Sequence, residues 1–210
     1  MVPINSESIK HLDWAKGDGL LPAIVQHASD GRVLMLGYMN AEALDQTRTS
    51  ARVTFFSRSK QRLWTKGETS GHSLELVELL VDCDADTILV KAIPHGPTCH
   101  LGTTTCFGDT PAPGVGFLAQ LAAVIADRAQ AGGAESYTAR LLGTGVKRCA
   151  QKVGEEGVEV ALAALAGNRE ELAEEAADLL FHLLVCLQAA DVGLDEVMAV
   201  LRQRHQPKAE

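Results

Sequence analysis

The sequence lacks an excess of basic residues. Its 210 residues include 19 lysines and arginines against 27 aspartates and glutamates, a net charge of −8. Both halves share the deficit: residues 1–109 hold 10 basic and 13 acidic side chains, and residues 110–210 hold 9 and 14. Such a chain attracts a phosphate backbone poorly, so nucleic-acid binding is not expected. An anionic substrate would need divalent cations between itself and this protein.

The sequence also lacks the features of an exported or membrane-spanning protein. Its first residues show no basic start followed by an apolar run, and its apolar stretches are too short to cross a bilayer. We therefore expect a cytoplasmic protein with no membrane partner. An odd number of cysteines then predicts metal ligation or burial rather than disulfides. The five are Cys83, Cys99, Cys106, Cys149 and Cys186.

Hydrophobic periodicity divides the chain into two parts. Up to about residue 107, short runs rich in Val, Ile, Leu and Phe predict strands, with one helix over Ala41–Thr49 that Asn40 can cap. From Phe117 onward, apolar residues recur at helical spacing. The strands are expected at Arg32–Met39, Arg52–Ser57, Leu74–Val81 and Thr87–Ile93. The helices are expected from Phe117, over Val146–Ala166, over Arg169–Ala190, and from Gly193 through Arg204.

The segment between the two parts can continue neither pattern. Residues 109–116, Asp-Thr-Pro-Ala-Pro-Gly-Val-Gly, include two prolines and two glycines. We predict an α+β fold, with a β-rich domain over residues 1–109, a linker over 110–116 and an all-α helical bundle over 117–210. Gly167 is expected to end one long helix, and Asn168 with Glu171 to form the capping box of the next.

Three aspartates alternate in Asp82-Cys-Asp-Ala-Asp86. If the segment is extended, the carboxylates share one face and Cys83 points to the other. Carboxylates this close repel each other unless a hard cation lies among them. An EF-hand begins in the same way, but Thr87 and Ile93 stand where that loop needs Gly and Glu. A cation site and a solvated acidic turn both remain open.

Cys99 and Cys106 lie in a loop-prone stretch rich in Gly, Pro and Thr, and Cys83 adds a third thiolate. Structural zinc sites have four protein ligands, whereas catalytic sites keep three and leave one position for water. Three cysteines therefore fit an open metal site. Free cysteine is also a common core residue, so both interpretations stand on the residues alone.

Five ordered motifs resemble phosphoribosyl-AMP cyclohydrolase. They are Gly37–Asn40, Phe56–Lys60, Trp64–Gly71, Asp82–Asp86 and Gly96–His100, and the similarity covers residues 15–108. Thr105 stands where serine is expected in the family, a change that keeps the hydroxyl. The resemblance implies a homodimer in which the zinc cysteines come from two subunits. It implies Zn²⁺ on Cys83, Cys99 and Cys106, and Mg²⁺ on Asp82, Asp84 and Asp86.

The reaction implied is hydrolytic opening of an adenine ring that is ribosylated at N1. Zinc lowers the pKa of bound water towards 7, so that hydroxide can attack C6 and the C6–N1 bond breaks. His100 is the candidate for proton transfer, since imidazole exchanges protons near neutral pH; a turn residue bonded to backbone is its alternative. Side chains around Trp64 are candidates for holding the phosphoribosyl groups, and an ordinary cationic strand is their alternative. They are Arg58, Lys60, Arg62, Trp64, Lys66, Thr69, Ser70 and Gly71.

Acidic residues at helical spacing characterise the second part. Glu155, Glu156 and Glu159 share one helical face, for which a solvated surface is the ordinary interpretation. Apolar residues surround Glu159, however, and also Asp178, which lies one turn after Glu175. An acid on a core-facing stripe is costly unless it is paired or bound to metal. Two antiparallel helices could bring these acids together around Mg²⁺.

The spacing Glu-Glu-x-x-Glu followed by Glu-x-x-Asp resembles the all-α nucleoside-triphosphate pyrophosphatases. Ser136–Leu142 and Lys152–Glu159 narrow the similarity to phosphoribosyl-ATP pyrophosphatase, over residues 116–205. The resemblance implies Mg²⁺ on Glu155, Glu156, Glu159, Glu175 and Asp178. It also implies attack of water between the α and β phosphates, with Glu159 and Asp178 as catalytic residues. The candidates for phosphate contact are Lys147, Arg148 and Lys152.

Together the two resemblances imply successive steps of histidine biosynthesis, because the product of the C-terminal reaction is the substrate of the N-terminal one. The rival enzyme is a general nucleotide pyrophosphatase, which the acidic helices alone would allow. The alternative from another class is a binding protein without enzymatic activity. Its zinc would be structural, with all four positions filled by protein ligands, and its helices would serve only for dimerisation. Cys149 and Cys186 are expected to be core or neutral positions.

Overall fold

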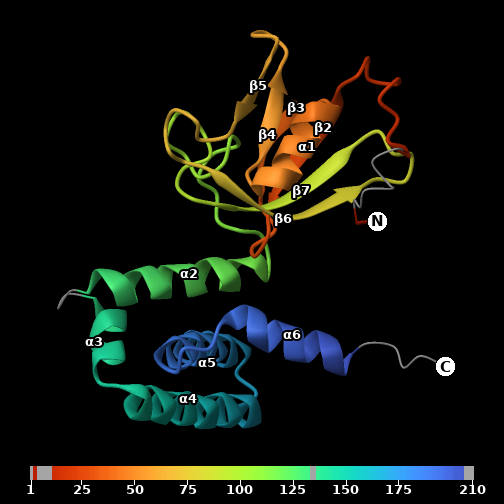
Figure 1. Cartoon of the computed structure of the whole chain (residues 1–210). Coiled ribbons are helices and arrows are strands. Elements are labelled where there is room, and N and C mark those ends of the chain that lie inside the picture. Colours follow the sequence, from red (N-terminus) through yellow and green to blue (C-terminus); the bar gives the residue numbers. More distant parts are fainter. Residues whose placement is uncertain (1, 4–10, 133–135, 206–210) are drawn as a thin grey trace. The chain divides into compact units, whose positions relative to one another are not determined.

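The structure, a computed structural model, describes residues 2–3, 11–132 and 136–205. It divides into two compact units, Met1–Phe117 and Leu118–Glu210, which we describe separately. Strands dominate the first and helices the second (Figure 1), so the α+β prediction is confirmed. In the described ranges no single helix is long and apolar enough to span a membrane. One bent pair of successive helices, Arg169–Ala189 and Leu194–Arg204, meets the length and composition criteria only when joined.

A five-stranded sheet forms the centre of the first unit. Its strands are β1 (Val2–Pro3), β2 (Leu21–His27), β3 (Val33–Met39), β6 (Leu74–Val81) and β7 (Ile88–Pro94). They lie in the order β1-β6-β7-β2-β3, with β2 and β7 parallel and the other neighbours antiparallel. Alternate residues of β2 and β7 are buried, as expected for strands with one face on a core.

A helix and a hairpin complete the core of this unit. Helix α1 (Ala41–Ser50) begins where the Asn40 side chain accepts the Ala43 N–H at 2.8 Å, as predicted. The hairpin consists of β4 (Thr54–Ser57) and β5 (Arg62–Thr65). A Cβ at Gly37 of β3 would meet the ring of Phe55, which is fully buried. The glycine therefore lets the hairpin, with its basic residues, pack closely on the sheet.

The second unit is helical. Its helices are α2 (Gly116–Ala131), which begins at the end of the first unit, α3 (Tyr137–Gly143), α4 (Val146–Ala166), α5 (Arg169–Ala189) and α6 (Leu194–Arg204). α4 and α5 form a hairpin joined at Gly167, whose φ of 72° is left-handed. The Asn168 side chain accepts the N–H groups of Glu170 and Glu171, so the predicted N-cap is confirmed.

The helical unit has a small core and exposes many apolar side chains. Its fully buried cluster consists of Ile125, Leu141, Cys149, Leu184 and Val185, far fewer residues than the core of the sheet unit. On α4, Leu162 is 60% exposed and Leu165 is 87% exposed. Leu180 and Leu183 of α5 are exposed as well. The hairpin therefore keeps an apolar stripe that the single chain does not cover.

Most predicted elements are confirmed, with ends that differ by one or two residues. Leu74–Val81 and Val146–Ala166 have the predicted bounds, whereas β4 and β7 begin later than expected. The elements β1, β2, β5 and α3 are not predicted from periodicity, and β1 has only two residues. β5 and α3 are too short to show a clear period, and β2 contains Pro22, which argues against a strand.

Candidate active sites

The acidic segment after β6 forms a turn, so the extended arrangement considered from its sequence does not occur. Ala85 has a left-handed φ of 59°, and Asp82 Oδ1 accepts the N–H groups of Asp86 and Thr87, each at 3.1 Å. An aspartate that bonds nearby backbone N–H groups stabilises a turn against strand pairing. The carboxylates of Asp82, Asp84 and Asp86 still gather, with one oxygen of each within 4.8 Å of the others.

A lysine from a distant segment lies in this aspartate cluster. Lys16 Nζ is 2.7 Å from Asp84 Oδ2 and also forms an ion pair with Asp86. The hydrogen bonds to Asp84 and Asp86 raise the pKa of Lys16, and the bond from Lys16 lowers the pKa of Asp86. The aspartate cluster thus accommodates a cationic group. Three converging carboxylates also match the oxygen ligands that Mg²⁺ prefers, so these residues fit the expected metal.

The loop after β7 brings two thiols together. The Cys106 N–H donates to the Leu34 carbonyl at 2.8 Å, which fixes the loop on β3, and the Cys99 N–H donates to the Thr103 carbonyl at 3.1 Å. The two thiols lie close enough that each shifts the pKa of the other. Bonds from the Leu101 backbone and the Thr103 side chain lower the pKa of Cys99, whereas desolvation of its sulfur raises the pKa of Cys106. One chain therefore offers two adjacent soft ligands, which fit zinc.

Cys83 lies apart from these two thiols. It is exposed in the acidic turn, with its Sγ 4.0 Å from Asp84 Oδ1. Over the described ranges, the sulfurs of Cys83, Cys99 and Cys106 do not all come within 4.8 Å of one another. A three-thiolate site is therefore not assembled within this single chain.

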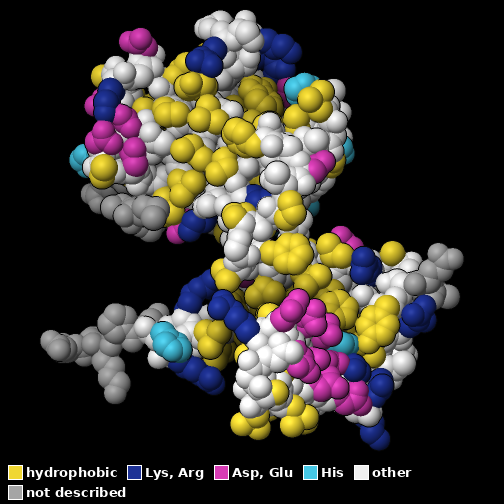
Figure 2. Space-filling view, turned by 180° about the vertical axis from the view of Figure 1, so that it is seen from behind, with side chains coloured by type: hydrophobic (Ala, Val, Ile, Leu, Met, Phe, Trp, Pro, Cys, Tyr) yellow, Lys and Arg dark blue, Asp and Glu magenta, His cyan; other side chains and the backbone are white. Residues whose placement is uncertain are grey.

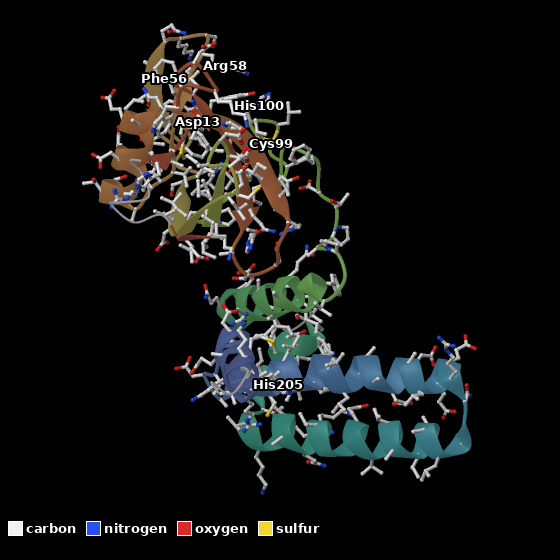
Figure 3. The ribbon with its side chains drawn as sticks, turned by 90° about the vertical axis from the view of Figure 1, so that its right-hand side faces the viewer. Asp13, Phe56, Arg58, Cys99, His100 and His205 are labelled. Carbon is white, nitrogen blue, oxygen red and sulfur yellow. The ribbon has the colours of Figure 1, made fainter. Side chains whose placement is uncertain are left out.

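Cys99 and Cys106 line a cavity of about 390 Å³. His100 lines the same cavity, with its Nδ1 3.9 Å from Cys99 Sγ (Figure 3). Burial lowers the pKa of Lys66, which shares this wall. The cavity thus places aromatic, cationic and hydroxyl groups beside two thiols, a set suited to a planar anionic ligand. The predicted substrate-binding residues that line it are Trp64, Lys66 and Ser70.

A second and more basic cavity, of about 300 Å³, adjoins the first and shares those three residues. Glu68 binds Arg62 at 2.5 Å and raises the pKa of the arginine, so part of the positive charge is already neutralised. Arg58 lines neither cavity; its guanidinium lies 3.8 Å from the centroid of the Tyr38 ring. The further predicted residues that line the second cavity are Lys60, Arg62 and Thr69.

In the helical unit, packing of α4 on α5 brings acids together. One oxygen of each of Glu156, Glu175 and Asp178 lies within 4.8 Å of the others. Glu156 is 4% exposed, Glu175 is half-buried and Asp178 is exposed. Acidic side chains gather on one face of this unit, with basic side chains beside them (Figure 2). The carboxylates of this glutamate cluster again match Mg²⁺.

A lysine is also part of the glutamate cluster. Lys152 Nζ is 2.5 Å from Glu156 Oε1 and 3.1 Å from Glu155 Oε2. The bond from Lys152 lowers the pKa of Glu156, whereas the bond to Glu156 and its like charge raise the pKa of Glu159. The other carboxylate oxygen of Glu155 accepts from Arg148 at 3.1 Å. Arg148 and Lys147 are exposed at the first turn of α4.

The expectation that Glu159 and Asp178 face a core is wrong for the single chain. Both are exposed, and Val158 and Leu162 beside Glu159 are 59% and 60% exposed. The buried acid is Glu156. Periodicity identifies the apolar stripe on which a residue lies, but it does not show whether the chain covers that stripe.

His182 of α5 is a buried residue beside the acids that sequence reasoning misses. Its Nε2 is 3.0 Å from the Tyr137 hydroxyl, and its Nδ1 is 2.9 Å from the Asp178 carbonyl oxygen and 3.5 Å from Glu156 Oε1. If the Nδ1–H donates to the carbonyl, Nε2 accepts from the tyrosine. The imidazole therefore joins α3, α4 and α5 at the glutamate cluster. The one sequence signal was a polar residue within the apolar run Leu179–Val185.

Two family models match the chain, one in each unit. The model for phosphoribosyl-AMP cyclohydrolase matches residues 35–108, and the model for phosphoribosyl-ATP pyrophosphohydrolase matches residues 118–205. Similar proteins span nearly the whole chain. The "Histidine biosynthesis bifunctional protein HisIE" of Salmonella typhimurium is 59% identical over 203 residues, 97% of this chain and 100% of the relative. Proteins of the same name from Escherichia coli K12 and Xanthomonas campestris are each 58% identical, covering 97% and 95% of this chain and 100% and 95% of their own.

Proposed function

The chain belongs to the family of bifunctional histidine-biosynthesis proteins HisIE, and we propose that it carries out both hydrolytic steps on one nucleotide in succession. It is a bifunctional hydrolase with cyclohydrolase and pyrophosphohydrolase domains. Residues 117–210 release pyrophosphate from phosphoribosyl-ATP, residues 1–109 open the ring of the resulting phosphoribosyl-AMP, and residues 110–116 link them. The observation that carries this proposal is that each unit has its own set of metal-ligating side chains within the residues that one family model matches.

Zinc would be held by Cys83, Cys99 and Cys106. The adjacent thiols of Cys99 and Cys106 support this, since thiolates are preferred zinc ligands. When bound with an open position, zinc supplies an activated water for attack on C6. His100 at the same cavity would accept a proton from the attacking water and return it to N1 as the C6–N1 bond breaks.

The two adjoining cavities would hold the phosphoribosyl groups. Lys60, Arg62 and Lys66 provide positive charge, and Thr69 and Ser70 provide hydroxyl groups for the phosphate oxygens. Trp64, shared by both cavities, offers an aromatic face to the purine. Arg58, held over Tyr38, would reach a phosphate only by leaving that ring. Mg²⁺ on Asp82, Asp84 and Asp86 would add positive charge.

In the helical unit, Glu156, Glu175 and Asp178 would hold Mg²⁺, and Glu159 and Glu155 extend the acidic face. Bound Mg²⁺ offsets phosphate charge and assists the attack of water between the α and β phosphates. Glu159 is suited to accept the proton of this water, because the neighbouring Glu156 raises its pKa. Lys147, Arg148 and Lys152 at the start of α4 would contact phosphate oxygens.

The active form would be a homodimer that shares its zinc ligands. Cys83 lies apart from Cys99 and Cys106 within one chain, and a second copy would supply the missing thiolate. The uncovered apolar stripe of the α4–α5 hairpin, which includes Leu162 and Leu165, also favours a second copy. All five cysteines are free, which supports a reducing compartment such as the cytoplasm.

The test supplies the purified protein with phosphoribosyl-ATP, Mg²⁺ and Zn²⁺ and measures pyrophosphate and the ring-opened nucleotide. Both products should form. Removal of zinc should stop ring opening while pyrophosphate is still released. A protein that cleaves unrelated nucleoside triphosphates equally well and opens no ring would be a general pyrophosphatase instead.

A further inference from the structure

Thr98 has a buried hydroxyl without a partner. The residue is 3% exposed, and over the described ranges its Oγ1 is the one buried side-chain nitrogen or oxygen that makes no hydrogen bond. Other buried threonines are bonded: the Thr47 hydroxyl donates to the Ala43 carbonyl at 2.8 Å, and the Thr105 hydroxyl donates to the Gly108 carbonyl at 2.8 Å. A buried hydroxyl without a partner costs free energy, so it calls for a ligand or another explanation.

Thr98 is one of the residues that line the cavity with the two thiols. It directly precedes Cys99, and His100 and Cys106 line the same cavity. The Thr98 N–H donates to the Thr104 carbonyl at 3.4 Å, which closes the loop around Cys99. The backbone therefore holds Thr98, with its unpartnered hydroxyl, beside a cavity of about 390 Å³, large enough to receive part of a nucleotide.

We propose that the Thr98 hydroxyl binds the substrate at the reacting edge of the purine, through the exocyclic nitrogen on C6. The proposal rests on the function proposed above for the first unit. C6 is the carbon that water attacks, so it must face the side of the cavity where Cys99 and Cys106 lie. Its nitrogen substituent would then lie near Thr98, which precedes Cys99 and lines the same cavity.

A hydroxyl suits this position because it both donates and accepts hydrogen bonds. During the reaction the water oxygen bonds to C6 and the C6–N1 bond breaks. One proton of the water goes to N1, and the other goes to the exocyclic nitrogen, which is an imine in the neutral N1-substituted purine. The exocyclic nitrogen stays on C6, which becomes the carbon of a carboxamide. The threonine can keep its hydrogen bond throughout, while it neither gains nor loses a proton. Thr98 is therefore a substrate-positioning group, distinct in role from His100.

The decisive variant is Thr98→Val, which keeps the side-chain shape and removes the hydroxyl. In the zinc-loaded full chain, kcat/KM for opening phosphoribosyl-AMP should fall by roughly 5- to 20-fold, the loss of one hydrogen bond. The Tm of the protein without substrate should stay equal or rise, because an unpartnered hydroxyl adds nothing to the free protein. Zinc content and pyrophosphate release should match the wild type. Thr98→Ser should restore most of kcat/KM.

Thr47→Val is the matched control, because that hydroxyl is buried and bonded within α1. It should lower the Tm and leave kcat/KM unchanged, the reverse of Thr98→Val. Normal kcat/KM in Thr98→Val would overturn the proposal. A lower Tm in that variant would also overturn it, since the hydroxyl would then serve the protein itself through a water or a second copy. Loss of zinc would assign it to the metal instead. Failure of the proposed function would look different, since the wild type would open no ring.

Discussion

The two acidic clusters are built in opposite ways. In the sheet unit, three aspartates within five residues meet on one turn, whereas in the helical unit Glu156 meets Glu175 and Asp178 only because α4 packs on α5. The aspartate cluster therefore depends on local backbone, and the glutamate cluster depends on tertiary packing. The aspartate cluster could be predicted from the sequence although its backbone forms a turn and not a strand. Residues this close in the chain lie near one another in either conformation. A packed cluster depends on which helix face is covered, and motif spacing does not specify that.

The largest expected effect tests whether the chemistry of the two units is separable. Cys83 is exposed, so Cys83→Ala removes a predicted zinc ligand without leaving a cavity in the core. Bound zinc should be lost and ring opening should fall by more than about 10³-fold, with pyrophosphate release largely spared. Metal analysis and the two assays check this. Cys186→Ser in α5 is the control and should change neither metal content nor ring opening. Full zinc and normal ring opening in Cys83→Ala would remove Cys83 from the site.

Mixing variants then tests whether one zinc site draws on two chains. Cys83→Ala keeps Cys99 and Cys106, and Cys99→Ala keeps Cys83, so neither homodimer has a complete set. A mixed dimer has one complete set if Cys83 works with Cys99 and Cys106 of the partner subunit. Equal mixing with random exchange should restore roughly a quarter of wild-type ring opening. No recovery after demonstrated chain exchange would place all three ligands in one chain.

The next effect separates two neighbouring glutamates of α4. Glu156→Gln keeps the shape of a buried side chain but removes a predicted metal ligand and the partner of Lys152. Pyrophosphate release should fall by about 10³-fold, while supplied phosphoribosyl-AMP is still opened. Glu155→Gln should cost less than about tenfold, because that carboxylate bonds Arg148 and Lys152 and is not one of the three that converge. A greater loss in Glu155→Gln would show that burial and clustering do not identify the ligands. Asp178→Asn should resemble Glu156→Gln.

The success and failure of prediction in the helical hairpin have a common physical origin. The end of α4 and the start of α5 follow from the sequence because Gly167 and Asn168 act on their own neighbours. The exposure of Glu159 does not follow from the sequence. The apolar residues around it show that it lies on an apolar face of α4, but they do not show whether another element packs on that face. The ion pair of Lys16 with Asp84 could not be predicted for the same reason, because the two residues lie 68 positions apart and no local sequence pattern links them. Groups brought in by tertiary packing therefore need the structure.

A smaller effect on pyrophosphate release is expected from His182, which contacts the Asp178 carbonyl and Glu156 of the glutamate cluster. His182→Gln keeps a polar group near the Nε2 position but loses the Nδ1 contact with the Asp178 carbonyl and Glu156. Pyrophosphate release and Mn²⁺ affinity should both fall by roughly 10- to 100-fold, the usual cost of a residue that orients ligands. His182→Asn retains a donor near Nδ1 and should lose less. Equal losses of Tm in both variants with normal Mn²⁺ affinity would make the histidine purely structural.

The smallest expected effect concerns the lysine in the aspartate cluster. The Lys16 side chain is 51% exposed, whereas Lys152 in the glutamate cluster is 20% exposed. Exposed ion pairs are weak, so Lys16 should compete only modestly with a metal for Asp84 and Asp86. Lys16→Gln should therefore raise the Mn²⁺ affinity of the aspartate cluster by about two- to fivefold.

This change is measurable in a Glu156→Gln background, where Mn²⁺ binding to the glutamate cluster is disabled. Lys91→Gln is the matched control, because Lys91 pairs with Glu78 at 2.8 Å and away from the aspartates. Raising KCl from about 50 to about 300 mM should shrink the gain, since salt screens exposed charges. Weaker Mn²⁺ binding in Lys16→Gln would mean that the lysine holds the turn in shape. Unchanged binding at both salt concentrations would place the metal away from Asp84 and Asp86, and the aspartate cluster would then be a solvated acidic turn.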